Sequence, residues 1–380
     1  MNFDFSAEQK ALAEQARRFL AAECPSSAVR AVMDSDRKHD ARLWKGLAEM
    51  GFLGIVIPER FGGLGLSHLE LCVVAEELGR ALAPVPFSSS VYLATEFLLA
   101  AGSPAQQERW LPRLASGESI GTFAFAEQAG AVTPQSIRMQ ARTGVNGARL
   151  NGSKTVVPDL GIADFAIVAA RSAPGRDARG ISLYLVELDQ SGVARTAQPT
   201  LDPSRGHGRL DCVDAKAQLL GRAGQGGALI TQVFDRAAVL TAFEQIGGAD
   251  RALEMGRDYA LDRMAFGRPI GSFQAIKHML ADMYVSATLA RSNSYYGAWA
   301  LSTGAPELPV AAATARVSAT QAFQHCAKNN IQVHGGVGFT WAFDCHLYYR
   351  RANLLAVSLG SLSQWEDALV ERMRTRQLAA

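Results

Sequence analysis

The sequence has few cysteines, no long apolar run and no excess of charge of either sign. Its five cysteines are scattered without a C-x-x-C pair, so no zinc or dithiol redox site is indicated and we expect reduced thiols. Basic and acidic residues number 38 and 36, which excludes a global field that attracts nucleic acid or an anionic membrane. No apolar run reaches the roughly 18 residues of a membrane span, and the start lacks the order of a secretory signal. We therefore expect a cytoplasmic protein without a bound metal, a nucleic-acid partner or a membrane partner.

What the sequence does have is apolar content for a large core, since 48% of its 380 residues are hydrophobic. Residues 1–119 predict an all-α domain. Ser6 with Gln9, and Ser103 with Gln106, form capping boxes that mark helix starts. Three glycines between Pro58 and Gly65 indicate a tight turn within this domain.

Residues 120–222 predict a central β-domain, because short β-rich runs alternate with turn clusters. The dipeptides Asn146-Gly147 and Asn151-Gly152 are typical of hairpins, which favours antiparallel pairing. Residues 223–380 return to helical periodicity and predict a bundle of four or more helices, with a break at Gly304 to Pro309. One apolar stripe of the bundle reads as core: Ile276, Met279, Leu280, Met283, Ala287 and Ala290. The fold class is α+β, mostly α.

Two strings in the last block carry a specific likeness. They are Arg263 to Gln274 (RMAFGRPIGSFQ) and Gln332 to Thr340 (QVHGGVGFT). Together they resemble the acyl-CoA dehydrogenase family, and weaker agreement at Glu76 to Arg80 and at Asn151 to Lys154 extends the resemblance over nearly the whole chain. The resemblance implies an N-terminal helical domain, a central β-domain and a C-terminal four-helix bundle. It also implies an acyl-CoA substrate, FAD as cofactor and an electron-transfer flavoprotein as acceptor, although a more open site would suit oxygen.

The resemblance implies that one group of residues contacts the flavin of a neighbouring subunit, chiefly its adenosine diphosphate half. A pyrophosphate is well held by a fixed guanidinium, amide donors and backbone N–H groups exposed by glycine. Each residue also has a plainer interpretation. Arg263 could form a surface salt bridge, Gly335-Gly336 could only cap a helix, and His334 is assigned no chemistry. The predicted cofactor-binding residues are Arg263, Phe266, Gln274, Gln332, Gly335, Gly336 and Ser361.

The catalytic base is where the sequence departs from the family pattern. Many members carry a glutamate in a Y-E-G-T string, and the matching string here is Ser358-Leu359-Gly360-Ser361. Other members carry it on the first bundle helix, where this chain has Ala237. Neither side chain can remove a proton from the substrate α-carbon. Glu244, seven positions beyond Ala237, is the best replacement, but a buried partner for an arginine is its more ordinary role.

Groups around the flavin ring depart as well. The family's Trp-Ile-Thr string corresponds to Val156-Val157-Pro158, a loop hydroxyl corresponds to Ala126, and a substrate-side arginine corresponds to Ala238. Two hypotheses follow. The chain could be an active dehydrogenase in a homodimer or homotetramer with an unrecognised base. Alternatively, it could be a non-catalytic subunit of a heterotetramer that lends the ADP-binding half of the FAD site to a homologous chain, as in some bacterial members.

Overall fold

The structure is a computed structural model that describes residues 5–36, 39–130, 132–144, 147–175 and 177–379. The chain divides into two compact units. The helical unit comprises residues 1–30, 68–83 and 238–380, and the sheet unit comprises residues 31–67 and 84–237. The order of helices, strands and helices agrees with the predicted α+β class. Among the described residues, no helix is both long and apolar enough to cross a bilayer.

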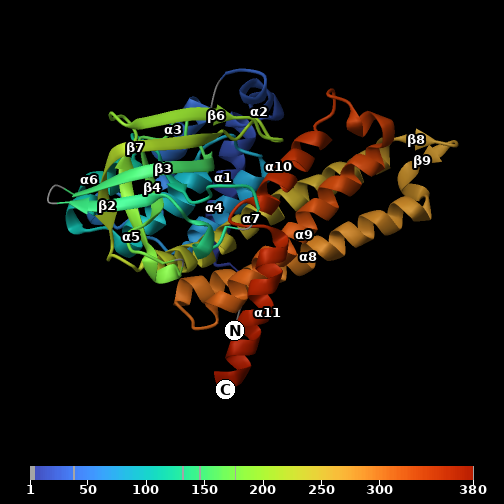
Figure 1. The fold of residues 1–380 in the computed structure, drawn as a ribbon. Helices are drawn as coiled ribbons and strands as arrows, with labels where there is room; N and C mark the ends of the chain where they lie inside the picture. Colours follow the sequence, from blue (N-terminus) through green and yellow to red (C-terminus); the bar gives the residue numbers. More distant parts are fainter. Residues whose placement is uncertain (1–4, 37–38, 131, 145–146, 176, 380) are drawn as a thin grey trace. The chain divides into compact units, whose positions relative to one another are not determined.

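The helical unit is dominated by long helices, of which α8 and α9 run side by side (Figure 1). Helix α8 ends where Gly304 adopts a left-handed φ of 61°, so the predicted break between two long helices is confirmed. Helix α7 begins in the sheet unit and continues into this one. The elements are α1 (Ala7–Glu23), α2 (Ser26–Met33), α4 (His68–Arg80), α7 (Gly226–Asp262), β8 (Met264–Ala265), β9 (Arg268–Pro269), α8 (Gln274–Thr303), α9 (Leu308–His334), α10 (Cys345–Val357) and α11 (Leu362–Ala379).

Helices α4 and α7 touch through their backbones at two glycines. A Cβ at Gly79 would lie 1.8 Å from the carbonyl oxygen of Glu244, and one at Gly247 would lie 1.9 Å from that of Glu76. No side chain fits at either distance, so glycine is required at both positions. The contact fixes the part of α7 that carries Glu244.

The sheet unit contains a seven-stranded sheet in the order β1-β4-β2-β3-β7-β5, with β6 paired to β7. Most pairings are antiparallel, as predicted, but β4 pairs in parallel with β1 and with the end of β2. The strands are β1 (Gly121–Ala124), β2 (Gln140–Gly144), β3 (Gly147–Pro158), β4 (Phe165–Arg171), β5 (Ile181–Glu187), β6 (Val193–Gln198) and β7 (His207–Leu220). The helices are α3 (Ala41–Glu49), η3 (Ser88–Thr95, a π-helix), α5 (Glu96–Ala101) and α6 (Pro104–Ala115).

The local sequence patterns predicted some helix starts correctly and one turn incorrectly. Both capping boxes are confirmed, at Ser6 with Gln9 and at Ser103 with Gln106. The prediction that Asn151-Gly152 forms a hairpin turn is wrong, because it lies within β3 at a register shift and Gly152 has a φ of 139°. A bulge meets the same need for an unusual φ that a turn does. Asn146 lies outside the described residues, and Gly147 opens β3 in antiparallel pairing with β2.

Candidate functional site

The segment from Arg263 to Phe273 forms a short hairpin just after α7. Strands β8 and β9 pair across a two-residue tip, where Phe266 and Gly267 have positive φ values of 51° and 78°. The Phe266 ring meets Phe273 edge-on at 6.1 Å, yet 95% of its surface is exposed. The hairpin therefore presents an aromatic ring outward.

Arg263 and Gln274 flank this hairpin, and both are exposed. Within the described residues, no hydrogen bond or ion pair engages the Arg263 guanidinium, so the plainer interpretation of a surface salt bridge has no partner here. The Arg263 backbone is fixed, since its carbonyl accepts a 2.8 Å bond from the Ile270 N–H. A guanidinium on a fixed backbone suits an external anion.

The turn from Gln332 to Gly336 closes α9 in the same unit. Gly335 is the helix cap, with φ 62° and ψ −139°, so the capping interpretation is confirmed. A Cβ at Gly335 or Gly336 would meet no atom within 4 Å, so the backbone here faces open space. Gln332 is exposed beside it. A cap whose backbone is open to solvent can also receive a phosphate.

His334 has the structural role that the sequence indicated. Its Nδ1 lies 2.8 Å from the carbonyl oxygen of Asn330, and its ring stacks on Tyr259 with centroids 4.1 Å apart. Burial lowers the pKa of the imidazole, although the bond to Asn330 opposes that shift. The stacked imidazole, bonded to the Asn330 carbonyl, stabilises the helix end.

The turn predicted to correspond to the family's usual base follows α10. Leu359 has a left-handed φ of 62°, which is rare for a residue with a branched side chain. Its carbonyl accepts a 3.1 Å bond from the Trp365 indole N–H. Ser361 forms a capping box with Gln364 at the start of α11, and this cap accounts for its hydroxyl without a ligand.

Glu244, the replacement candidate, is buried in the helical unit with 1% of its side chain exposed. An oxygen of its carboxylate lies 3.6 Å from an Arg351 nitrogen, and Arg351 is also 1% exposed. This geometry matches the alternative reading, in which Glu244 is a buried partner for an arginine. Ala237 is completely buried and carries no ionisable group.

The residues predicted to correspond to the family's flavin-ring contacts, Val156 to Pro158, lie in the sheet unit. Val156 has a φ of 52° and is 55% exposed. Its N–H donates 2.8 Å to the Gln198 side chain of β6, so that donor is already occupied. The Pro158 carbonyl accepts a 2.6 Å bond from Thr122. Neither Val156 nor Pro158 offers an aromatic face or a hydroxyl.

The loop that carries Ala126 is held by a buried ion pair. Lys154 is fully buried, and its Nζ donates 2.7 Å to Glu127 and 3.0 Å to the Phe125 carbonyl. Burial lowers the pKa of this amine to about 8, although Glu127 opposes the shift. The Thr155 N–H donates 2.8 Å to the Ala126 carbonyl. The loop backbone is thus fixed even though its hydroxyl is missing.

The position predicted to correspond to the family's substrate-side arginine holds Ala238. Ala238 is completely buried. In the sheet unit, the nearby Arg236 pairs with Glu96 at 2.8 Å, and Glu96 is fully buried. An arginine committed to a buried carboxylate is not free for a ligand.

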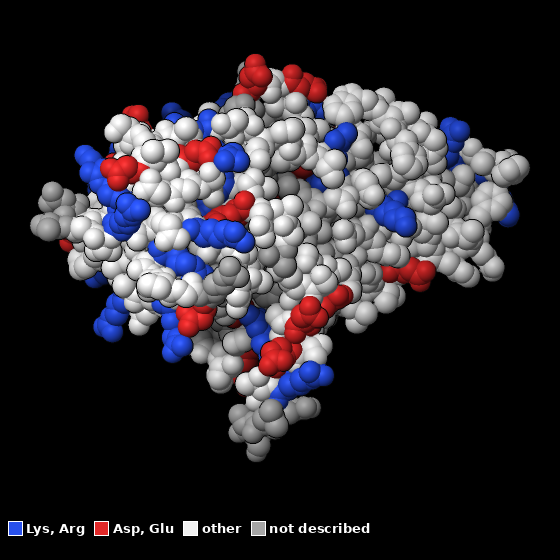
Figure 2. Space-filling model, viewed as in Figure 1, with Lys and Arg blue, Asp and Glu red and all other residues white. Residues whose placement is uncertain are grey.

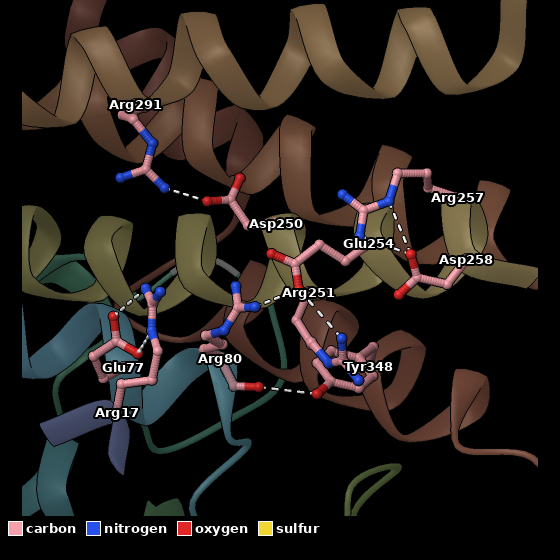
Figure 3. Close-up of polar contacts among 10 residues, drawn as sticks. All are labelled: Arg17, Glu77, Arg80, Asp250, Arg251, Glu254, Arg257, Asp258, Arg291 and Tyr348. Atoms are coloured by element: carbon pink, nitrogen blue, oxygen red, sulfur yellow. Dashed lines mark hydrogen bonds and ion pairs between the residues drawn. The ribbon is translucent and has the colours of Figure 1, made fainter. Parts of the chain in front are cut away.

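The string from Glu76 to Arg80 belongs to a charged network in the helical unit (Figure 3). Arg17 binds Glu77 at 2.7 Å, and Arg291 binds Glu76 at 2.9 Å and also Asp250. Burial raises the pKa of Glu76, and Arg291 opposes that shift. The network also joins Arg80 and Arg251 to Glu254, and Tyr348 to the Arg80 carbonyl. These bonds tie α1, α4, α7, α8 and α10 together, so this part of the likeness reflects stability.

Known proteins match this chain over its whole length. Residues 6–118, 122–211 and 224–372 match the N-terminal, middle and C-terminal domains of acyl-CoA dehydrogenase. Acyl-CoA dehydrogenase IpdE2 of Mycobacterium tuberculosis is 36% identical over 349 residues, which cover 91% of each chain. The chain belongs to the acyl-CoA dehydrogenase family. Members of this family are FAD-dependent oxidoreductases.

Solved structures of acyl-CoA dehydrogenases are similar throughout the fold. The ChsE4-ChsE5 complex from Mycobacterium tuberculosis has a chain with a TM-score of 0.88 and 30% identity, covering 100% of this chain and 99% of that one. A variant of the steroid ACAD Tcur3481-Tcur3483 gives a TM-score of 0.88 at 29% identity, covering 98% of this chain and 99% of that one.

The domain boundaries predicted at residues 119 and 222 remain predictions.

Sequence reasoning missed the side chains that hold the turn around Leu359. Arg316 is 1% exposed and Trp365 is 6% exposed, and they bind the carbonyls of Ser358 and Leu359. One signal was available for Arg316, which stands among alanines in the run from Ala311 to Thr320 (AAATARVSAT). A single arginine among small apolar residues of a bundle helix indicates a buried cation that needs partners.

Proposed function

We propose that this chain is a subunit of a heteromeric acyl-CoA dehydrogenase and lends the ADP-binding half of an FAD site to a homologous partner. One contrast supports this proposal. Among the described residues, the Arg263 and Gln274 side chains expected to reach the adenosine diphosphate are exposed and make no hydrogen bond or ion pair, and the backbone of the Gly335-Gly336 turn faces open space. The position of the base holds Leu359, and the replacement acid Glu244 is engaged by Arg351.

The ADP half of FAD fits these residues chemically. Arg263 offers a charged planar donor, and Gln274 and Gln332 offer amide groups. The open backbone at Gly335 and Gly336 allows close approach of phosphate oxygens. Phe266 supplies an exposed apolar ring beside them in the sequence. The hydroxyl of Ser361 is already used in its helix cap.

The residues expected around the flavin ring and the substrate are poorly suited to bind the ring or to perform the reaction. Dehydrogenation removes a proton from the α-carbon of the thioester while FAD, when bound, accepts a hydride from the β-carbon. An accessible carboxylate whose pKa is raised is suited to remove this proton. Leu359 cannot accept it, and Glu244 is buried in an ion pair. The partner therefore supplies the base and the ring pocket, with an electron-transfer flavoprotein as the expected acceptor.

The similar solved structures favour the same assignment. ChsE4-ChsE5 and the steroid ACAD Tcur3481-Tcur3483 are both heteromeric complexes. Both match nearly the full length of this chain. By analogy, we assign this chain an acyl-CoA substrate that is oxidised on the partner.

Co-expression tests the proposal. We expect the chain purified alone to bind little flavin and to show no acyl-CoA oxidation with an artificial acceptor. Co-expressed with a homologue that carries the glutamate, it should form a yellow, active complex. A yellow homotetramer that turns over acyl-CoA on its own would establish the alternative, an active homo-oligomer with an unrecognised base.

A matched pair of variants then tests the ADP contact. Arg263→Ala should weaken flavin retention in the complex about 10- to 100-fold, because a hydrogen bond to a charged group contributes about 1.5–3 kcal/mol. Arg257→Ala is the control, since Arg257 is exposed on the preceding helix and paired with the adjacent Asp258. Equal flavin affinity in the two variants contradicts the role given to Arg263.

A further inference from the structure

A buried guanidinium lies at the C-terminal end of α10. Arg316, on α9, is 1% exposed and donates 2.7 Å to the Gln245 side chain. Its other terminal nitrogen donates to the carbonyls of Leu355 and Ser358, the latter at 2.6 Å. Carbonyls at the end of a helix carry partial negative charge, so they stabilise this cation together with the charge of the Glu244 carboxylate.

These bonds fix the direction of the side chain at position 359. The Ser358 carbonyl belongs to the peptide plane before Leu359, and the Leu359 carbonyl belongs to the plane after it. Arg316 holds the first plane and Trp365 holds the second, at 2.6 and 3.1 Å. With both planes held, φ and ψ of residue 359 are set, and these angles determine where its Cβ points.

The backbone of the turn shows that such restraint is needed. Leu359 has a φ of 62° and Gly360 a φ of 107°. A leucine avoids the left-handed region unless the surroundings impose it. The Gln245 side chain accepts a hydrogen bond from the other terminal nitrogen of Arg316. The Gln245 amide is oriented by the bond of 3.1 Å that it donates to Thr320.

We propose that Arg316 is a positioning residue for position 359, acting through the Ser358 carbonyl to aim the side chain there. The proposal goes beyond the proposed function and does not depend on it, because it concerns how this turn is held and which way the side chain at position 359 points. It also assigns a role to a buried cation of which no carboxylate is a hydrogen-bond partner among the described residues.

A spin label reports the direction directly. Leu359→Cys gives one accessible thiol for a nitroxide, because all five native cysteines are buried. Arg316→Met in that background should remove the immobilised component of the spectrum. Arg316→Lys should restore it, because an ammonium still binds the two carbonyls. Thr320→Val is the control, since Thr320 is equally buried one helical turn away and bonds only Gln245 among the residues of this network.

The outcomes separate clearly. A folded Arg316→Met protein whose spectrum matches that of its parent overturns the proposal. The same holds if Thr320→Val releases the label as strongly as Arg316→Met does. Should Arg316→Met not fold, Arg316→Gln takes its place, because it removes the charge and keeps an amide donor. This experiment measures no turnover, so a negative result does not contradict the proposed heteromeric assembly. In the same way, a failed co-expression experiment does not contradict the role proposed for Arg316.

Discussion

Single buried charges in this chain have distinct effects on its stability. Glu244 and Arg351 neutralise each other inside the helical unit, whereas Lys154 in the sheet unit is held beside Glu127 at the cost of desolvation. Burial dominates for Lys154, because the pKa of its amine falls from 10.5 to about 8 in spite of the carboxylate. The amine therefore loses its proton within a range that is easy to study.

The pH dependence of unfolding should show this loss. Between about pH 8 and pH 10.4, the unfolded chain keeps a proton that folded Lys154 releases, so stability rises with pH by at most about 1.4 kcal/mol per unit from this group. We expect the unfolding free energy of the natural chain, measured with urea, to rise relative to that of Lys154→Met as the pH increases over that range. A constant difference contradicts the assigned shift.

Within the sheet, three cations stand in one row across neighbouring strands. Arg142 of β2 lies opposite Arg149 of β3, and Arg149 lies opposite Lys216 of β7. Figure 2 shows basic side chains over the strands on the left of the view, with acidic ones between them. Arg149 also contacts Asp214 at 3.4 Å. Like charges in directly opposed positions destabilise a strand pair.

Reversing one charge in the row should stabilise the sheet. Lys216→Glu turns the Arg149 pair into an attractive one, and we expect a gain of about 0.2–1 kcal/mol at low salt. The gain should shrink as salt screens exposed charges. Lys216→Gln, which only removes the repulsion, should give a smaller gain in the urea midpoint. A lower midpoint for Lys216→Glu than for the natural chain rules out this account.

Helices and strands were predictable where the deciding contacts are local. The capping boxes at Ser6 and Ser103 were found because each bond spans three residues. Asn151-Gly152 was misread because the same dipeptide suits a turn and a bulge, and only the neighbouring strand decides between them. The segment around Phe266 was singled out through the family likeness, but its hairpin and its exposed ring were not predicted. The role of Arg316 depends on α7, α9 and α10 meeting in space, which no local pattern shows.

At the scale of the whole molecule, the outer side of α8 is a candidate surface for assembly with another chain. The predicted core stripe is buried at Met283, Ala287 and Ala290 and only partly covered at Ile276, Met279 and Leu280. Its other side exposes Tyr284, Val285 and Leu289 by 62%, 54% and 61%. Large exposed apolar groups gathered on one helix are typical of a subunit interface. We expect another chain of the family to cover them.

A charge on this face should break the assembly. Leu289→Glu should shift the complex to smaller species in analytical ultracentrifugation, because an unpaired carboxylate is costly in an apolar interface. Val213→Glu is the control, since Val213 is 72% exposed in the sheet unit. Unchanged sedimentation of the Leu289→Glu protein shows that α8 faces solvent in the complex.

The hairpin at the end of α7 bears on biosynthesis. A newly made copy carries the bare ring of Phe266 on a two-stranded projection that its own fold leaves uncovered. Uncovered apolar surface is what chaperones and proteases act upon. In the proposed heteromer, the lifetime of an orphan copy is then set by how soon a companion arrives, so matched synthesis of the two chains would preserve both.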